Sequence, residues 1–281
     1  MRKYLNHLRA KGFTKFNAQK VLYRLTHIRK WKQGQKKVYL VYTPGKVGSQ
    51  SIYLTLRNHL MESNVFHIHF LSYEWLCKHD FDGSEKATVV QQVKQIYSLL
   101  RSDINLKIIC IVRDPISKTI SQLFQTPKAF GIPEKSLLKL SPIEISDLLI
   151  AHKKHFYSSC EWFDNEFFKF TTIDVYQKIF DHVEKKQVIE SNNIHALILR
   201  TEDLKHEDLV LENLGNFVEK PIRRLIIGNR TENKTTGELY REVKSIMRFP
   251  EDFLKQIYSS KYCQHFYTKQ EVNSFIDHWK L

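Results

Sequence analysis

Residues 43–51, TPGKVGSQS, combine side chains and turn residues that could hold an anion. An apolar run over residues 38–42 predicts a buried strand, and apolar residues recur at helical spacing over 52–60. Two glycines, a proline and Lys46 lie in the turn between these elements. Such a turn gathers backbone N–H groups, and the helix dipole adds about half a positive charge. The stretch therefore predicts a site for a phosphate-like group.

This turn differs from the Walker A motif of kinases and ATPases. In that motif a lysine and a hydroxyl residue directly follow the second glycine, whereas Lys46 precedes Gly48. The order argues against ordinary ATP chemistry. Lys46 could still neutralise a leaving group between two anionic groups, and a plain strand–helix turn is the structural alternative.

A second group of residues, RDPISKTIS, starts at Arg113 after an apolar run over 107–112. Arg113 leaves the carboxyl end of this predicted strand, the edge at which α/β sheets bind ligands. Ser121 follows about two turns along the next predicted helix. An arginine fork and a serine hydroxyl can together bind a phosphate. The alternative is that Arg113 pairs with Asp114 or caps local structure.

His67 and His69 alternate along a predicted strand over 65–71, so their imidazoles would point to one face. Histidine titrates near neutrality, so either could take a proton from a hydroxyl group. A packed histidine pair remains open, and a metal pair is weaker because no third ligand has a telling spacing. Glu74 and Asp164 are further candidate bases.

The two anion motifs together resemble those of sulfotransferases that use 3′-phosphoadenosine-5′-phosphosulfate (PAPS). Their order and their separation of about 65 residues agree with that family. The likeness is closest to carbohydrate sulfotransferases and to a bacterial family of capsular polysaccharide synthesis proteins, and it is strong over residues 37–125. Weaker similarity to the family extends over residues 197–204, 228–237 and 249–271. Gln50 departs from the pattern, since serine or threonine is usual there, but an amide can still bond an anion.

This resemblance implies sulfuryl transfer from PAPS to a hydroxyl of a carbohydrate acceptor, a cell-surface or capsular polysaccharide or its precursor. The product would be adenosine 3′,5′-bisphosphate, and no metal is expected. Lys46 and His67 or His69 would be catalytic, and Arg113 with Ser121 would bind the 3′-phosphate. The implied cofactor-binding residues are Pro44, Gly45, Lys46, Val47, Gly48, Ser49, Gln50, Ser51, Arg113, Ser121, Arg230, Thr231 and Lys234.

Two other classes of protein remain open. A P-loop kinase or other nucleotide-dependent transferase would need an acid at a strand end to bind Mg²⁺, and the candidate is Asp114. A non-catalytic protein could bind a membrane or nucleic acid through a basic N-terminal arm. That class leaves the paired anion motifs unexplained.

The elements that must position these residues alternate between strand and helix. After the strands at 38–42, 65–71 and 107–112, another is predicted at 196–200. Crossovers of this length favour an α/β fold of P-loop type, with three layers and a central, mainly parallel sheet flanked by helices. Helices are predicted at 84–102, 141–158, 206–218, 240–247, 251–258 and 270–279, with loops at 126–142 and 228–237.

The net charge of +14 belongs to the first fifth of the chain. Residues 1–61 hold fourteen Lys and Arg and no Asp or Glu, whereas the rest holds 30 of each sign. Residues 1–36 predict a basic helical segment, which either contacts an anionic membrane peripherally or packs on the domain. Residues 37–281 predict a single α/β domain, with no nucleic acid as partner.

Several features predict a cytoplasmic location. No apolar run is long enough to cross a membrane, and the N-terminus lacks the apolar core of a secretory signal. The four cysteines lie far apart and form no CxxC pair, which favours a reducing compartment.

Overall fold

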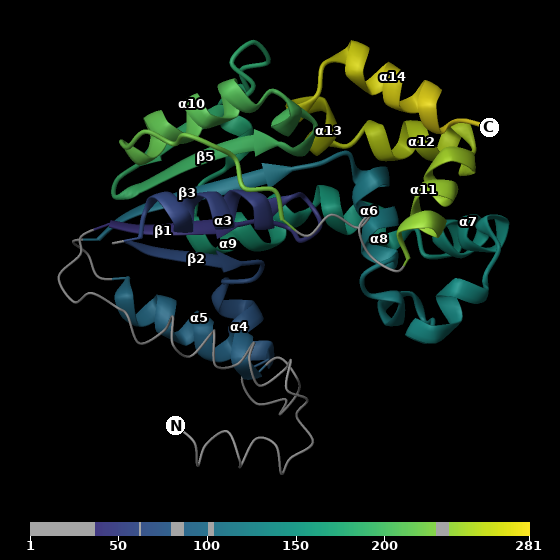
Figure 1. Ribbon diagram of the computed structural model, residues 1–281, viewed down its shortest axis with the longest axis horizontal. Helices are drawn as coiled ribbons and strands as arrows, with labels where there is room; N and C mark the ends of the chain where they lie inside the picture. Colours follow the sequence, from purple (N-terminus) through teal and green to yellow (C-terminus); the bar gives the residue numbers. More distant parts are fainter. Residues whose placement is uncertain (1–36, 62, 80–86, 101–103, 229–235) are drawn as a thin grey trace.

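The computed structural model describes residues 37–61, 63–79, 87–100, 104–228 and 236–281 (Figure 1). The basic segment predicted at 1–36 lies outside these residues. Arg230, Thr231 and Lys234, which the resemblance assigns to the nucleotide, also lie outside them.

A five-stranded sheet with the order β2-β1-β3-β5-β4 forms the centre of the fold. Its first three neighbouring pairs are parallel, and only β4 runs antiparallel to β5. The mainly parallel sheet that the sequence predicts is therefore confirmed. The strands are β1 (Lys37–Tyr42), β2 (Asn64–Ile68), β3 (Asn105–Val112), β4 (Gln187–Ser191) and β5 (Ile194–Arg200).

The antiparallel edge strand β4 was not predicted from the sequence. It contains polar residues such as Gln187 and Glu190, and it lacks the apolar run that marks a strand covered on both faces. A two-residue turn, Asn192 and Asn193, joins it to β5, and Asn192 has a φ of 50°. An Asn-rich two-residue turn is the available hairpin signal.

Helices lie on both faces of the sheet, so the three-layer arrangement is confirmed (Figure 1). Alternate residues of β1 face opposite layers. Tyr39 and Val41 pack with α3 and with α10 (Glu207–Val218), while Leu40 and Tyr42 pack in the larger core with α5, α6 and α8. As far as residue 160 the described α-helices are α3 (Ser49–His59), α4 (Tyr73–His79), α5 (Ala87–Leu99), α6 (Pro115–Leu123), α7 (Pro142–Ala151) and α8 (Lys154–Cys160).

The second half of the chain is mostly helical. A π-helical turn, Phe163–Phe167, carries the aromatic-rich stretch into the large core. The C-terminal helices gather beyond the carboxyl ends of β3 and β5 (Figure 1). The helices are α9 (Phe168–Thr171), α10 (Glu207–Val218), α11 (Gly237–Ile246), α12 (Glu251–Tyr258), α13 (Lys261–Phe266) and α14 (Lys269–Trp279).

Two predicted elements differ in detail from the structure. The helix predicted at 141–158 is broken at His152 into α7 and α8. The predicted loop at 126–142 contains two short 3₁₀ turns, and its Phe130 and Leu137 are buried in the core. Apolar packing therefore fixes this segment to the domain.

The order of the strands places a ligand-binding edge at β1 and β3. From β1 the chain crosses to β2 on one side, and it later enters β3 on the other side. In open α/β sheets a crevice opens at such a switch point, outside the carboxyl ends of the strands. The segments that leave β1 and β3 there are the turn 43–48 and Arg113 with Asp114.

Candidate functional site

The turn after β1 is held in a left-handed backbone conformation at two positions. Lys46 has a φ of 70° and Gly48 a φ of 77°, and Gly48 is the N-cap of α3. The first turn of α3 has no acidic residue and no side-chain cap. The N–H groups at the start of α3 therefore have no side-chain acceptor, and a bound anion could accept their hydrogen bonds.

The side chains of Pro44 and Val47 support this turn from within. Both are buried, and Val47 packs against the core between the sheet and α3. Thr201 fastens the same segment, because its hydroxyl lies 2.7 Å from the carbonyl oxygen of Val47 and 3.0 Å from that of Val112. Of the predicted cofactor-binding residues, Pro44 and Val47 could reach a ligand only through their backbone.

Replacing Gly48 by alanine should destabilise the fold. An L-residue in the left-handed region costs about 1–2 kcal/mol, and the new Cβ would lie 3.1 Å from Leu204 Cδ1. Gly131→Ala is the matched control, since Gly131 has a φ of 74° and open space around it. Urea denaturation should show a larger loss for Gly48→Ala than for Gly131→Ala. Equal losses would contradict the packing part of this account.

The two anion motifs meet at the edge of the sheet. Arg113 donates from Nη1 to the carbonyl oxygen of Lys46 over 2.9 Å. The Lys46 ammonium donates to the side-chain oxygen of Gln125, just beyond α6. A turn from β1 and an arginine from β3, 67 residues apart, thus share one location.

The backbone of Arg113 is clamped from the C-terminal helices. Its N–H donates to the Tyr262 hydroxyl over 2.9 Å, and that hydroxyl lies 2.9 Å from the Arg113 carbonyl oxygen, to which it donates. Tyr262 belongs to α13, a helix that was not predicted from the sequence. The guanidinium of Arg113 is therefore presented from a fixed backbone.

Ser121, the predicted partner of Arg113, lies on α6 and is only 3% exposed. The Ser121 side chain is therefore almost fully covered by the protein. The burial of α6 on this side follows from its apolar residues, among them Ile116 and Ile120, which pack into the large core.

Two hydroxyls of the predicted phosphate site already have partners. Ser49 Oγ lies 2.8 Å from Nε2 of His67. Ser51 Oγ accepts a hydrogen bond of 3.1 Å from the N–H of Gly228. Gly228 also packs closely against α3, since a Cβ there would lie 3.2 Å from Cγ of Gln50. The segment before residues 229–235 therefore runs beside the first turn of α3.

His69 is the better oriented of the two histidines. It lies one residue beyond the end of β2, and its ring centroid is 4.9 Å from that of His67. Its Nδ1 lies 2.8 Å from the carbonyl oxygen of Thr43, an acceptor, so Nδ1 carries the proton. Nε2 then holds a lone pair, and it lies over Gly45, 3.6 Å from where a Cβ would be.

Burial keeps both imidazoles neutral. Desolvation, followed by the charges of Lys118 and Lys46, lowers the pKa of His69 despite its bond to Thr43. Desolvation and the neighbouring His69 lower the pKa of His67 to about 3. At pH 7 each ring can accept a proton, but His67 is a very weak base.

The other proposed bases are engaged elsewhere. Glu74 is paired with Lys169, and Asp164 lies 2.6 Å from Nζ of Lys261. Both carboxylates are substantially exposed, and each is shared with a surface lysine. The site geometry therefore favours His69 over either acid.

Two acids beside Arg113 are used to build the site. Asp114 is 2% exposed, caps α6 by accepting from the N–H of Ser117 over 2.8 Å, and accepts from the Tyr258 hydroxyl over 2.6 Å. Glu202 accepts from the N–H of Asp114 over 2.8 Å. Burial raises the pKa of Glu202 to about 7.

Sequence reasoning missed the residues that support the site from other elements. Glu166 receives the N–H groups of Leu71 and Ser72 just beyond His69, and Lys118 is buried on α6. Lys118 lies among apolar residues of a predicted helix, and this position could have indicated from the sequence that the lysine is buried. Glu166 has no comparable signal, because its partners are about 95 residues away.

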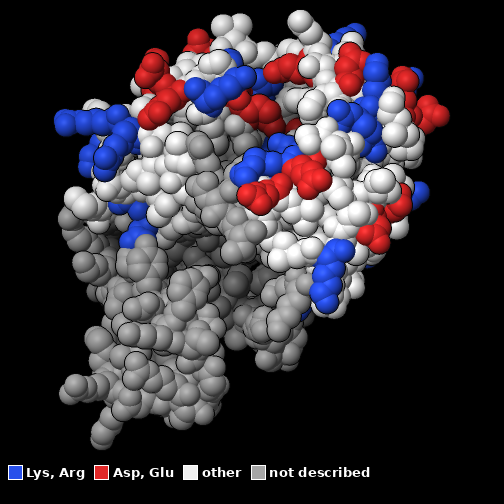
Figure 2. Space-filling model, turned by 45° about the vertical axis from the view of Figure 1, so that its right-hand side comes forward, with Lys and Arg blue, Asp and Glu red and all other residues white. Residues whose placement is uncertain are grey.

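Neither a metal site nor a membrane-spanning helix is found in the described part of the chain. No group of three or more His, Cys, Asp or Glu residues there has the arrangement to hold a metal ion. No described helix combines the length and apolarity needed to cross a bilayer. On the face shown in Figure 2, the described acidic and basic side chains are interspersed.

These features define a three-layer α/β protein with a glycine-containing turn, a helix N-terminus and two basic side chains at one sheet edge. Residues 145–268 match the family model described as "Putative capsular polysaccharide synthesis protein". The match covers less than half of the chain and lies beyond the two anion motifs. It includes β4, β5 and α13, and thus Thr201 and Tyr262, which hold those motifs. No curated protein and no solved structure matches the chain.

Proposed function

We propose that this protein transfers a sulfuryl group from PAPS to a hydroxyl of a carbohydrate during the synthesis of a capsular or cell-surface polysaccharide. The observation that carries the proposal is the meeting of the two anion motifs through the bond from Arg113 to the Lys46 carbonyl. The family description supplies the polysaccharide context. The same edge of the sheet is where an α/β fold of P-loop type would bind its nucleotide.

In this proposal the two motifs hold opposite ends of the donor. The N–H groups at the start of α3 bind the 5′-phosphate, assisted by the side chain of Gln50. Lys46 leaves Gln125 to neutralise the phosphate that departs. Arg113 and Ser121 bind the 3′-phosphate, which distinguishes PAPS from ATP; Ser121 would have to be uncovered for this contact. Arg230, Thr231 and Lys234, which lie outside the described residues, are assigned to the nucleotide by the family resemblance alone.

The transfer needs one base and a positioned acceptor. The sulfur–oxygen bond to the 5′-phosphate breaks while a bond forms to the acceptor oxygen, and the hydroxyl proton moves to Nε2 of His69. The protein acts mainly by alignment and charge neutralisation, as in phosphoryl transfer. The products are a sulfate ester and adenosine 3′,5′-bisphosphate.

The kinase alternative would need Asp114 to bind Mg²⁺. This carboxylate already caps α6 and accepts from the Tyr258 hydroxyl, so a metal would compete with those bonds. Titration with ATP and Mg²⁺, beside adenosine 3′,5′-bisphosphate, tests the proposal. Binding of the bisphosphate without metal is expected. Binding of ATP that requires Mg²⁺, with no binding of the bisphosphate, would favour a kinase.

Replacing Arg113 by methionine should remove the preference for a 3′-phosphate. Hydrogen bonds to charged groups contribute about 1.5–3 kcal/mol, which is about a 10- to 150-fold change in affinity. The affinity for adenosine 3′,5′-bisphosphate should fall by this factor, while that for adenosine 5′-phosphate changes little. Calorimetric titration measures both. Equal losses for the two nucleotides would mean that Arg113 only supports the Lys46 carbonyl.

A further inference from the structure

Two lysines are buried at opposite ends of the site-bearing elements, and their partners differ. Lys107 is 5% exposed near the amino end of β3, and Lys118 is 7% exposed on α6, beyond the carboxyl end of β3. Lysine is almost never buried to this extent unless it is paired. The two lysines therefore differ in whether the fold supplies a carboxylate to neutralise the ammonium.

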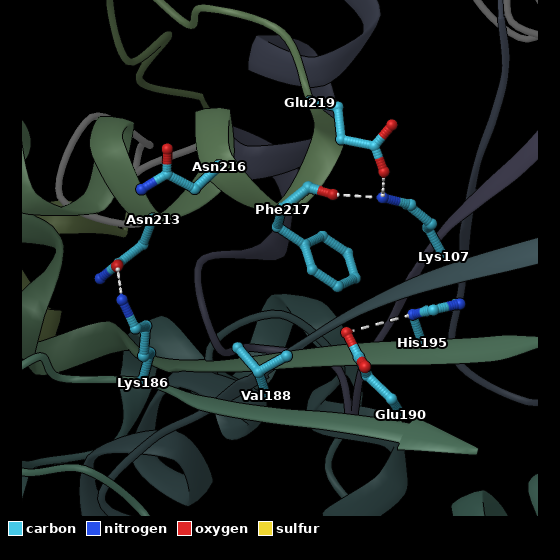
Figure 3. Close-up of a pocket in the computed structure, with 9 residues that line it drawn as sticks. All are labelled: Lys107, Lys186, Val188, Glu190, His195, Asn213, Asn216, Phe217 and Glu219. Carbon is cyan, nitrogen blue, oxygen red and sulfur yellow. Dashed lines mark hydrogen bonds and ion pairs between the residues drawn. The ribbon is translucent and has the colours of Figure 1, made fainter.

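Lys107 is neutralised inside the protein (Figure 3). Its ammonium donates to the carbonyl oxygen of Phe217 and to the carboxylate of Glu219, both over 2.6 Å. Hydrogen bonds from Lys107 and Lys37 lower the pKa of Glu219 to about 2. The charge of Lys107 thus has a counter-charge in the fold.

The other charged side chains that line the pocket beside Lys107 also have hydrogen-bonding or ionic partners. It has a volume of about 260 Å³ and is lined by strand residues and by α10 (Figure 3). Lys186 bonds Asn213 over 2.8 Å, and His195 lies 3.5 Å from Glu190. Since these polar groups already have partners, the pocket gives no reason to expect an anionic ligand.

Lys118 has only a neutral partner. Its Nζ donates to the side-chain oxygen of Gln122 over 3.2 Å. Among the residues that the structure describes, it forms no ion pair with a carboxylate. Burial lowers its pKa to about 8, which reflects the cost of keeping a charge there.

Three acids that support the site accept mainly from neutral donors. Backbone N–H groups and hydroxyls of Ser72, Ser117, Tyr42, Tyr258 and Tyr267 supply most of the bonds to them. Beside the effect of burial, Cys160 on α8 acts to raise the pKa of Lys118 and Arg113 acts to lower it, while Lys118 and Lys46 act to lower the pKa of His69. The acids concerned are Asp114, Glu166 and Glu202. Lys118 therefore lies close to another basic side chain, Arg113, and within the described ranges no carboxylate is paired with it.

We propose that Lys118 is an anion-binding residue of this site, whose ammonium exchanges Gln122 for an oxygen of a bound sulfate or phosphate group. Gln122 on α6 and Gln125 just beyond it are three residues apart, and their side-chain oxygens accept from Lys118 and Lys46 respectively. Gln122 can release Lys118 without the loss of an ion pair to any carboxylate that the structure describes. The identity of the anion as the phosphosulfate of PAPS rests on the proposed function, whereas binding of an oxyanion does not.

Thermal unfolding with inorganic sulfate tests this inference. Wild-type protein should gain in Tm as sulfate rises through the low millimolar range at constant ionic strength. Lys118→Met removes a buried charge of similar volume, so its Tm without sulfate should equal or exceed that of wild type, and its response to sulfate should be largely lost. Lys107→Met is the matched control: it should lower Tm, because the Phe217 carbonyl loses its donor and Glu219 keeps only Lys37, and it should keep the wild-type response.

A second variant supplies an internal anion. Gln122→Glu places a carboxylate beside Lys118, so the sulfate response should weaken while the chain still folds. In wild type the response should also decline above about pH 8, because Lys118 loses its proton there. The inference is overturned if wild type does not respond to sulfate, or if Lys118→Met lowers Tm without sulfate or keeps the full response. The nucleotide titration fails or succeeds separately, so the two proposals can be told apart.

Discussion

Lys46→Ala is expected to lower kcat for sulfuryl transfer by about 10²–10³, the loss typical of removing one group that stabilises developing charge. Lys46 is the one basic side chain in the turn, and its ammonium is held by the amide of Gln125, from which it can move. Release of adenosine 3′,5′-bisphosphate from PAPS, in the presence of a polysaccharide acceptor, measures the effect.

Stability provides the control for Lys46→Ala. Lys46 has a left-handed backbone, and alanine meets a similar backbone cost there, so the free energy of unfolding should change little. Lys255→Ala, which removes an exposed lysine on α12, should leave turnover unchanged. Turnover near that of wild type in Lys46→Ala would remove this lysine from the mechanism.

His69→Gln is expected to lower kcat by about 10²–10⁴, the usual contribution of a general base. Glutamine can retain a bond to the Thr43 carbonyl but cannot take the acceptor proton. Binding of adenosine 3′,5′-bisphosphate should be retained. His67→Gln should have a smaller effect, because Nε2 of His67 is bonded to Ser49 and burial makes this imidazole a very weak base. The assignment would be reversed if His67→Gln abolished transfer and His69→Gln did not.

The pH dependence of the wild-type enzyme follows from the same geometry. A general base must be unprotonated, and burial holds the pKa of His69 below its usual 6.5. The midpoint of the acid limb of kcat/KM should therefore lie below pH 6.5. An acid limb centred above pH 6.5 would point to a base other than His69.

The central part of the fold could be predicted because its signals are local. β1, the turn and α3 follow one another in the sequence, and β3 is a continuous apolar run that ends at Arg113. Placing both motifs at one edge needed only the rule for parallel strands. The edge strand β4 and the short helices α4 and α13 carry weaker local patterns and depend on tertiary contacts.

The residues that hold the two anion motifs in place could not be predicted, because their contacts join segments far apart in the sequence. Tyr262 clamps Arg113 across 149 residues, and Thr201 reaches Val47 across 154. Neither pairing has a sequence period or motif. The family match over 145–268 falls on the supporting half, where the predicted likeness was weaker, and not on the two motifs.

The most direct test of the account is whether the wild-type site recognises a 3′-phosphate. Calorimetric titration of the full chain with adenosine 3′,5′-bisphosphate and with adenosine 5′-phosphate, both without metal, compares ligands that differ only in that group. The account predicts at least about tenfold tighter binding of the bisphosphate. Equal affinities, or no binding of either nucleotide, would contradict it.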